Sequence, residues 1–121
     1  MSSAAKSILI FGAYLAVLGV GFLFAPNLLL GVFGFSLTNE VWIRVIAMLM
    51  LILAFYYIQM ARQEMTGLFR YTVYARATVI GFFAAFVALG FAPPVLLLFG
   101  TVDLLGALWT GLALRRATKS A

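Results

Sequence analysis

Four apolar stretches of about twenty residues each set most of what this chain can fold into. They run over residues 8–25, 41–60, 72–91 and 95–114. Each is close to the length that an α-helix needs to cross a hydrocarbon core of ~30 Å. The runs are continuous rather than alternating, and only helices and closed barrels satisfy their backbone in lipid, so helices are favoured over strands. We therefore predict an all-α integral membrane protein, a four-helix bundle.

The composition leads to the same class of protein. The chain is 66% hydrophobic and only 9% charged, whereas soluble domains carry about 25% charged residues. A soluble chain of 121 residues has too much surface to hide so many apolar side chains. At this length we expect one transmembrane domain over residues 1–121.

The residues that usually perform chemistry are scarce. The sequence has neither Cys nor His, which excludes disulfides, thiolate metal sites and His-ligated haem. It also lacks a Ser-His-Asp set, closely spaced paired carboxylates and a Gly-rich phosphate loop. We expect no catalytic residue, no metal and no cofactor, and the chain does not look like an enzyme.

The charged residues indicate a topology. The net charge is +5, but the charges lie at the ends of the apolar runs and resemble contacts for lipid headgroups rather than a basic face for nucleic acid. If the helices alternate direction, seven positive residues share one side: Lys6, Arg62, Arg70, Arg76, Arg115, Arg116 and Lys119. The positive-inside rule then predicts an up-down-up-down arrangement with both termini cytoplasmic, in a bacterial cytoplasmic membrane.

The three connections differ in character. Residues 26–40 form a long, mostly apolar outer segment in which we expect an interfacial stretch with a short helix lying flat. Residues 61–71 are predicted to be a polar cytoplasmic loop. The third connection is hardly longer than residues 92–94, so the last two helices should form a tight antiparallel hairpin.

Small residues recur at helical spacing in three of the runs. The stripes are Gly12, Ala16 and Gly19; Thr78, Gly81, Ala85 and Ala88; and Gly100, Asp103, Ala107 and Thr110. Such stripes let membrane helices approach closely, so we expect them to face the bundle, with Phe and Leu turned to lipid. A substrate path and a homodimer face are alternative uses of the same pattern.

Asp103 is the most informative charged residue, because it lies near the middle of the fourth run. A carboxylate at the bilayer centre costs roughly 2.5–3.5 kcal/mol, so it should face the interior and have a partner. Arg44, about one turn inside the second run, is the predicted partner, and Glu40 and Asn27 lie on the same outer side. The cluster would either fix the helix register or form a binding or proton-relay site.

A second group of charges surrounds the predicted cytoplasmic loop. It consists of Arg62, Glu64, Arg70 and Arg76. A solvated cluster beside the headgroups is the simpler interpretation, and a contact site for a cytoplasmic partner is the alternative.

Four segments resemble a known family. FLFAPNLLLGVFGF, EVWIRVIAMLMLILAFYY, FRYTVYARATV and APPVLLLFGTVDLLGALWTGLALRR are similar to small DoxX-like and related four-helix bacterial membrane proteins. The landmarks are Pro26, Arg44, Arg76 and Asp103. The resemblance covers nearly the whole chain and implies a four-helix inner-membrane protein, of a group in which some members are linked to membrane redox or sulfur chemistry near quinones.

Three functions remain open from the sequence. The first is a non-enzymatic structural or accessory subunit that binds lipid or a membrane partner, either a second copy or another protein. The second is a small transporter or channel that uses Arg44 and Asp103. The third is a quinone-associated redox accessory subunit.

Overall fold

The computed structural model describes the backbone of residues 1–120 and the side chains up to Ala117; the predicted cytoplasmic charge Lys119 lies outside the described side chains. The regular elements of the described chain are all helices: α1 (Ser3–Phe24), α2 (Pro26–Val32), α3 (Trp42–Arg62), α4 (Thr66–Ala88) and α5 (Leu96–Ser120). Within residues 1–120, four of these helices, all but α2, are long and apolar enough to span a membrane. The chain is thus an all-α, multi-pass membrane protein.

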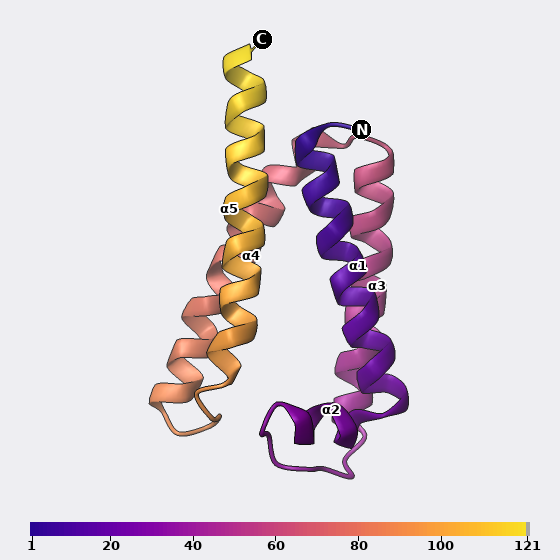
Figure 1. Cartoon of the computed structure of the whole chain (residues 1–121), viewed down its shortest axis with the longest axis vertical. Helices are drawn as coiled ribbons and strands as arrows, with labels where there is room; N and C mark the ends of the chain where they lie inside the picture. The colour runs from indigo at the N-terminus through magenta and orange to yellow at the C-terminus, as the bar shows by residue number, and fades with distance from the viewer. Residues whose placement is uncertain (121) are drawn as a thin grey trace.

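The long helices run alternately down and up, and both termini lie at the same end of the molecule (Figure 1). We call this the terminal end, and we call the opposite end, with α2 and the α4–α5 turn, the α2 end. The predicted up-down-up-down arrangement is confirmed.

The first helix begins and ends where local chemistry dictates. Ser2 caps α1, because its Oγ accepts a hydrogen bond from the Ala5 N–H at 3.0 Å. Pro26 has no N–H to continue the helix and instead occupies the first turn of α2. The predicted short helix in the outer segment is present, and it lies across the α2 end (Figure 1).

The predicted cytoplasmic loop over residues 61–71 is much shorter than expected. α4 begins at Thr66 rather than at residue 72, and the turn spans residues 63–65. Glu64 adopts a left-handed conformation (φ 52°) that reverses the chain in one step. Phe69 is completely buried, so the segment after the turn has an apolar residue to anchor it as helix despite its polar composition.

α4 and α5 form the predicted antiparallel hairpin, but their connection, residues 89–95, is longer than the predicted residues 92–94. α4 ends at Ala88 and α5 begins at Leu96. Gly90 takes a positive φ of 79°, which a residue without Cβ adopts without strain, and Pro93 and Pro94 precede α5.

The helices associate as two pairs, α1 with α3 and α4 with α5, and the pairs meet mainly through α1 and α5. They approach each other at the terminal end and diverge toward the α2 end (Figure 1). The core at the joint consists of Ala4, Ala5, Ile8, Ala61, Phe69 and Ala113. The result is a wedge that is closed at one end.

Two of the three small-residue stripes lie at helix contacts. A Cβ on Gly19 would come within 2.9 Å of Leu51 on α3, and one on Gly100 within 2.8 Å of Ile80 on α4. The α4 stripe was predicted wrongly: Thr78, Gly81, Ala85 and Ala88 are exposed, and a Cβ on Gly81 would meet nothing within 4 Å. α4 instead turns Phe residues toward the space between the pairs.

Candidate ligand cleft

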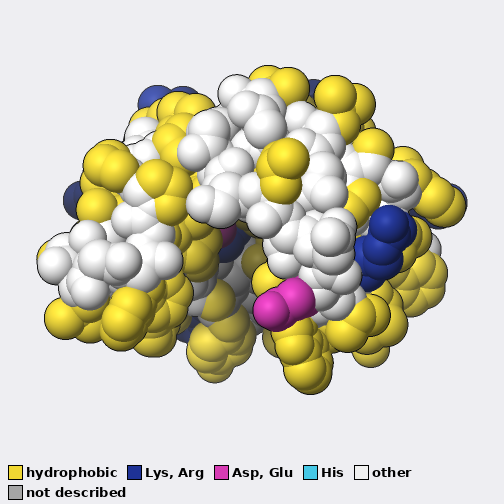
Figure 2. Space-filling model, turned by 90° about the horizontal axis from the view of Figure 1, so that it is seen from below, with side chains coloured by type: hydrophobic (Ala, Val, Ile, Leu, Met, Phe, Trp, Pro, Cys, Tyr) yellow, Lys and Arg dark blue, Asp and Glu magenta, His cyan; other side chains and the backbone are white. Residues whose placement is uncertain are grey.

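The space between the two helix pairs forms a cleft of about 570 Å³. Seen from the α2 end, the molecule is hollowed between two lobes, with charged side chains visible in the depth of the hollow (Figure 2). Every helix contributes to the wall. The lining residues are Tyr14, Leu15, Leu18, Phe22, Leu30, Phe35, Ile43, Ile46, Met50, Val79, Phe82, Phe83, Phe86, Leu96, Phe99 and Asp103.

The cleft runs lengthwise from the α2 end toward the middle of the membrane-spanning helices. Phe22 and Leu96 lie at its wide end, close to the termini of α1 and α5. Tyr14 and Asp103 lie deepest, and at 1.5 Å per residue Asp103 is about 10 Å along α5 from Leu96. Apolar side chains therefore line the walls, and the polar groups gather at the bottom.

Asp103 is the one charged residue among those that line the cleft. Its side chain is half-buried, and within the described part of the chain nothing forms a hydrogen bond or an ion pair with its carboxylate. It lies within electrostatic range of Tyr14 on α1, Tyr57 on α3 and Arg76 on α4.

Arg76 is the polar centre of the floor beneath the cleft. It is only 2% exposed, so the predicted cytoplasmic contact at this residue is wrong. Arg76 is already ten residues into α4 because the helix begins at Thr66. Its Nε donates to the Thr72 carbonyl at 3.2 Å, and its Nη2 donates to the hydroxyls of Thr72 at 3.1 Å and Thr110 at 2.8 Å.

A chain of hydrogen bonds through the hydroxyl groups around Arg76 links α4 to α1. The Thr110 and Ser7 hydroxyls lie 2.6 Å apart, and Ser7 donates to the Ala4 carbonyl at 2.6 Å. A hydroxyl has a single hydrogen, so Thr110 donates to Ser7 and accepts from Arg76. The network thus closes the wedge with hydroxyl groups that all have hydrogen-bond partners.

One nitrogen of Arg76 is left without a hydrogen bond. Nη1 is buried and has no partner among the described residues. A Cβ on Gly106 would lie 3.1 Å from it, so only glycine gives it this much room. The guanidinium carbon lies 4.8 Å from the Phe11 ring centroid and 5.9 Å from that of Tyr57, and these cation–π contacts offset part of the cost of burial.

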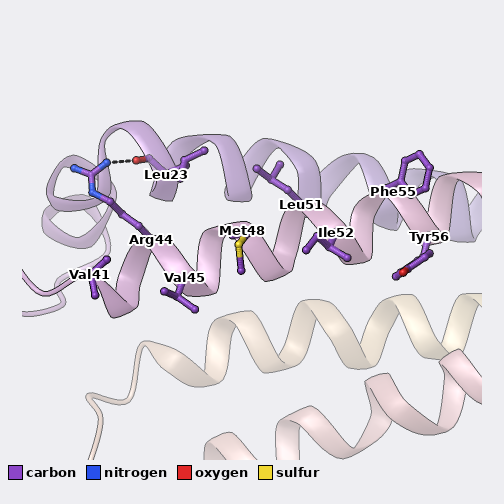
Figure 3. Close-up of a pocket in the computed structure, with 9 residues that line it drawn as sticks. All are labelled: Leu23, Val41, Arg44, Val45, Met48, Leu51, Ile52, Phe55 and Tyr56. Carbon is purple, nitrogen blue, oxygen red and sulfur yellow. Dashed lines mark hydrogen bonds between the residues drawn. The ribbon is translucent and has the colours of Figure 1, made fainter.

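The predicted pair of Arg44 and Asp103 does not form. Arg44 extends from the start of α3 and donates from Nη1 to the carbonyl of Leu23, near the end of α1 (Figure 3). It lines a separate shallow groove, of about 540 Å³, along α3. The end of α1 leaves backbone carbonyls without helical partners. The carbonyl of Leu23 is one of them, and because it accepts the hydrogen bond from Arg44, the guanidinium does not extend to α5.

Asn27 and Glu40 also lie away from Asp103. The Asn27 Oδ1 accepts from the Thr38 N–H at 2.9 Å, and the Glu40 N–H donates to Thr38 Oγ1 at 3.1 Å. Both residues order the segment between α2 and α3 and do not line the cleft.

The predicted cytoplasmic charge cluster is dispersed. Glu64 accepts from the Ser2 N–H at 2.6 Å and from the Ser2 Oγ at 2.8 Å, which lowers the pKa of its carboxyl below the ordinary value. Arg70 lies over the ring of Tyr71, 5.5 Å from its centroid, and Arg62 is exposed at the end of α3. Arg76 belongs to the cleft floor instead.

Several residues of the floor were not identified from the sequence: Ser7, Phe11, Tyr14, Tyr57 and Thr72. Thr110 was predicted only as a member of a small-residue stripe that faces the bundle. The spacing of Thr72 and Arg76, one helical turn apart, was the available signal. With residue 72 taken as the first residue of the helix, Arg76 instead resembles the positive residues that are common at cytoplasmic helix ends. The tyrosines carried no signal that separates them from interfacial tyrosines.

The acidic residues do not gather into a metal site. Among the described residues there is no group of three or more side chains that could hold a metal ion.

A scan against protein-family models, a search of curated proteins and a search of solved structures each returned no match. The resemblance to DoxX-like proteins stays a prediction.

Proposed function

We propose that this protein is a non-enzymatic membrane protein that binds a lipid or lipid-like molecule in the cleft between its two helix pairs. The observation that carries the proposal is the cleft itself, about 570 Å³ with apolar and aromatic walls and its polar groups at one end. Ligand pockets commonly have 300–1,000 Å³ and this mixture of walls and placed polar groups.

The proposed membrane is the bacterial cytoplasmic membrane, with the termini on the cytoplasmic side. Lys6, Arg62, Arg70 and Arg115 lie toward the terminal end, where the positive-inside rule puts them in the cytoplasm. The cleft then opens toward the outer leaflet, which supplies lipid directly.

A transporter that uses Arg44 and Asp103 is less well supported, because these residues belong to different surfaces. The buried floor of Arg76, Thr72 and Thr110 also closes the cleft toward the terminal end. A quinone remains one candidate occupant, since it too combines a polar ring with an apolar tail. A second copy or another membrane protein remains a proposed partner.

The test is to identify what the purified protein carries. The full chain is purified in a neutral detergent and bound lipids are counted by native mass spectrometry. Leu18, inside the cleft, is replaced by Trp to fill it, and Val17, which is 73% exposed on the adjacent face of α1, is replaced by Trp as a matched control.

We expect the wild type and Val17→Trp to retain a ligand through detergent exchange and Leu18→Trp to lose it. Equal retention by both variants would show that the lipid binds elsewhere. A wild-type protein without any ligand, and without uptake of added lipid, would overturn the proposal.

A further inference from the structure

We infer that the cleft selects amphiphilic cations, with a protonated amine held by Asp103 and an apolar tail lying between the helix pairs. The inference rests on the proposed function and names the chemical class of its ligand. It derives from a carboxylate that faces an apolar cavity and has no hydrogen bond or ion pair with the described residues.

A half-buried carboxylate in an apolar wall needs a donor or an opposite charge, because burying an unpaired polar group costs free energy. Among its described residues the protein provides Asp103 with no hydrogen bond and no ion pair, although it satisfies the hydroxyls of Ser7, Thr72 and Thr110. The missing partner of Asp103 therefore comes from the cleft side. An ammonium group has three donors and the complementary charge.

Arg76 does not serve as that partner. Its Nε and Nη2 are engaged with Thr72 and Thr110, and its Nη1 points to the backbone at Gly106. No ion pair joins it to Asp103 among the described residues, so its nitrogens stay more than 4.0 Å from the carboxylate oxygens. A ligand ammonium can approach to ~2.8 Å, and because Coulomb energy falls with distance, its attraction to Asp103 exceeds what Arg76 contributes.

The groups that face Asp103 from the other helices suit a cation. Tyr14 of α1 and Tyr57 of α3 are neutral rings with a hydroxyl, and Arg76 of α4 is the competing positive charge among the described residues. The guanidinium lies over the rings of Phe11 and Tyr57, whose faces partly offset its charge.

The walls suit the rest of such a ligand. From Asp103 to the wide end the cleft extends ~10 Å along α5, about the length of a medium alkyl chain or a fused aromatic ring system. Aromatic side chains along this path are Phe22, Phe35, Phe82, Phe83, Phe86 and Phe99. They pack against apolar tails and attract a cation that passes through the mouth.

The experiment compares three ligands with the same tail: decylamine, decanol and decanoate. Binding to the full chain in a neutral detergent is measured at pH 7 by native mass spectrometry. The first variant is Asp103→Asn, which keeps the shape of the side chain and removes its charge. The control is Glu40→Gln, which removes an acid at the α2 end of the molecule that does not line the cleft.

We expect the wild type and Glu40→Gln to bind decylamine at least tenfold more tightly than decanol. Asp103→Asn should bind the two equally, at the level of decanol. If Asp103→Asn fails to fold, the comparison of the three ligands on the wild type still tests whether the cleft selects a cation.

The other outcomes separate this inference from the proposed function. Equal binding of all three ligands to the wild type would overturn selection by charge and leave the lipid cleft standing. Preferred binding of decanoate would show that Arg76 recognises the headgroup and would also overturn the inference. Failure of every ligand to bind would contradict the cleft proposal itself.

Discussion

The Nη2 of Arg76 donates to the Thr110 hydroxyl at 2.8 Å, and this bond ties α4 to α5 at the point where the two helix pairs join. Through Thr110 and Ser7 the same network continues to α1. A buried arginine is thus the polar centre of a joint whose closed end defines the bottom of the cleft.

Replacing Thr110 by Val should lower the melting temperature of the protein in detergent. Val has a similar volume but leaves both Arg76 Nη2 and Ser7 without their partner. Hydrogen bonds between membrane helices contribute ~0.6–2 kcal/mol, and unsatisfied buried groups add to the loss. Thr101→Val is the matched control, because Thr101 is exposed on α5 and bonds only to Leu97 of its own helix. Equal melting temperatures for both variants would contradict a structural role of the network.

Replacing Gly100 by Ala should destabilise the α4–α5 pair. The new Cβ would lie 2.8 Å from the Ile80 side chain, 3.2 Å from the Ile80 Cα and 3.2 Å from Phe83. Since a backbone atom is involved, the helices must separate, at a cost of roughly 1–3 kcal/mol. Gly81→Ala, where a Cβ meets nothing within 4 Å, should leave thermal stability unchanged or raise it slightly. An equal decrease of the melting temperature in both variants would contradict the close helix contact at Gly100.

Glu64 should make stability depend on pH in the acidic range. The hydrogen bonds from Ser2 lower its pKa in the folded protein, so its contribution to stability is present above the ordinary glutamate pKa of about 4.3. The contribution is lost as pH falls through the lowered value. Melting curves of the wild type and Glu64→Gln should differ near pH 7 and converge below pH ~4. A difference that stays constant over this range would exclude linkage to the Glu64 carboxyl.

Arg44 should hold the outer end of α1 rather than the cleft. Its bond to the Leu23 carbonyl joins the start of α3 to the end of α1. Arg44→Ala should therefore speed amide hydrogen exchange in residues 21–32, with ligand binding in the cleft unchanged. Arg62→Ala, an exposed arginine at the opposite end of α3, serves as control. Loss of ligand binding in Arg44→Ala would contradict this prediction and show that Arg44 belongs to the binding site.

Much of the fold follows from the sequence, because the length and continuity of the apolar runs leave few alternatives to spanning helices. The boundary at Thr66 could not be predicted from hydropathy, since residues 66–71 include polar and charged side chains and are held by the burial of Phe69. That one misplaced boundary put Arg76 within about one turn of the predicted cytoplasmic end of its helix and hid its relation to Thr110.

Asp103 could be singled out from the sequence, but its surroundings could not. Hydropathy orders residues by depth, and Arg44 matched Asp103 roughly in depth. Hydropathy does not give the rotation of α3 about its own axis or the pairing of α1 with α3. These two features turn Arg44 toward the Leu23 carbonyl. The orientation of the α4 stripe was missed for the same reason.

The most direct test of the cleft uses tryptophan fluorescence. With Trp42 and Trp109 replaced by Phe, a single Trp is placed at Phe83 in the cleft or at Val17 on the outer face. A brominated decanol, which quenches nearby Trp, is titrated into protein in neutral lipid nanodiscs. The account predicts saturable quenching at position 83 with one ligand per protein, and quenching at position 17 that grows only in proportion to the ligand in the lipid. Linear, unsaturable quenching at both positions would contradict a ligand cleft between the helix pairs.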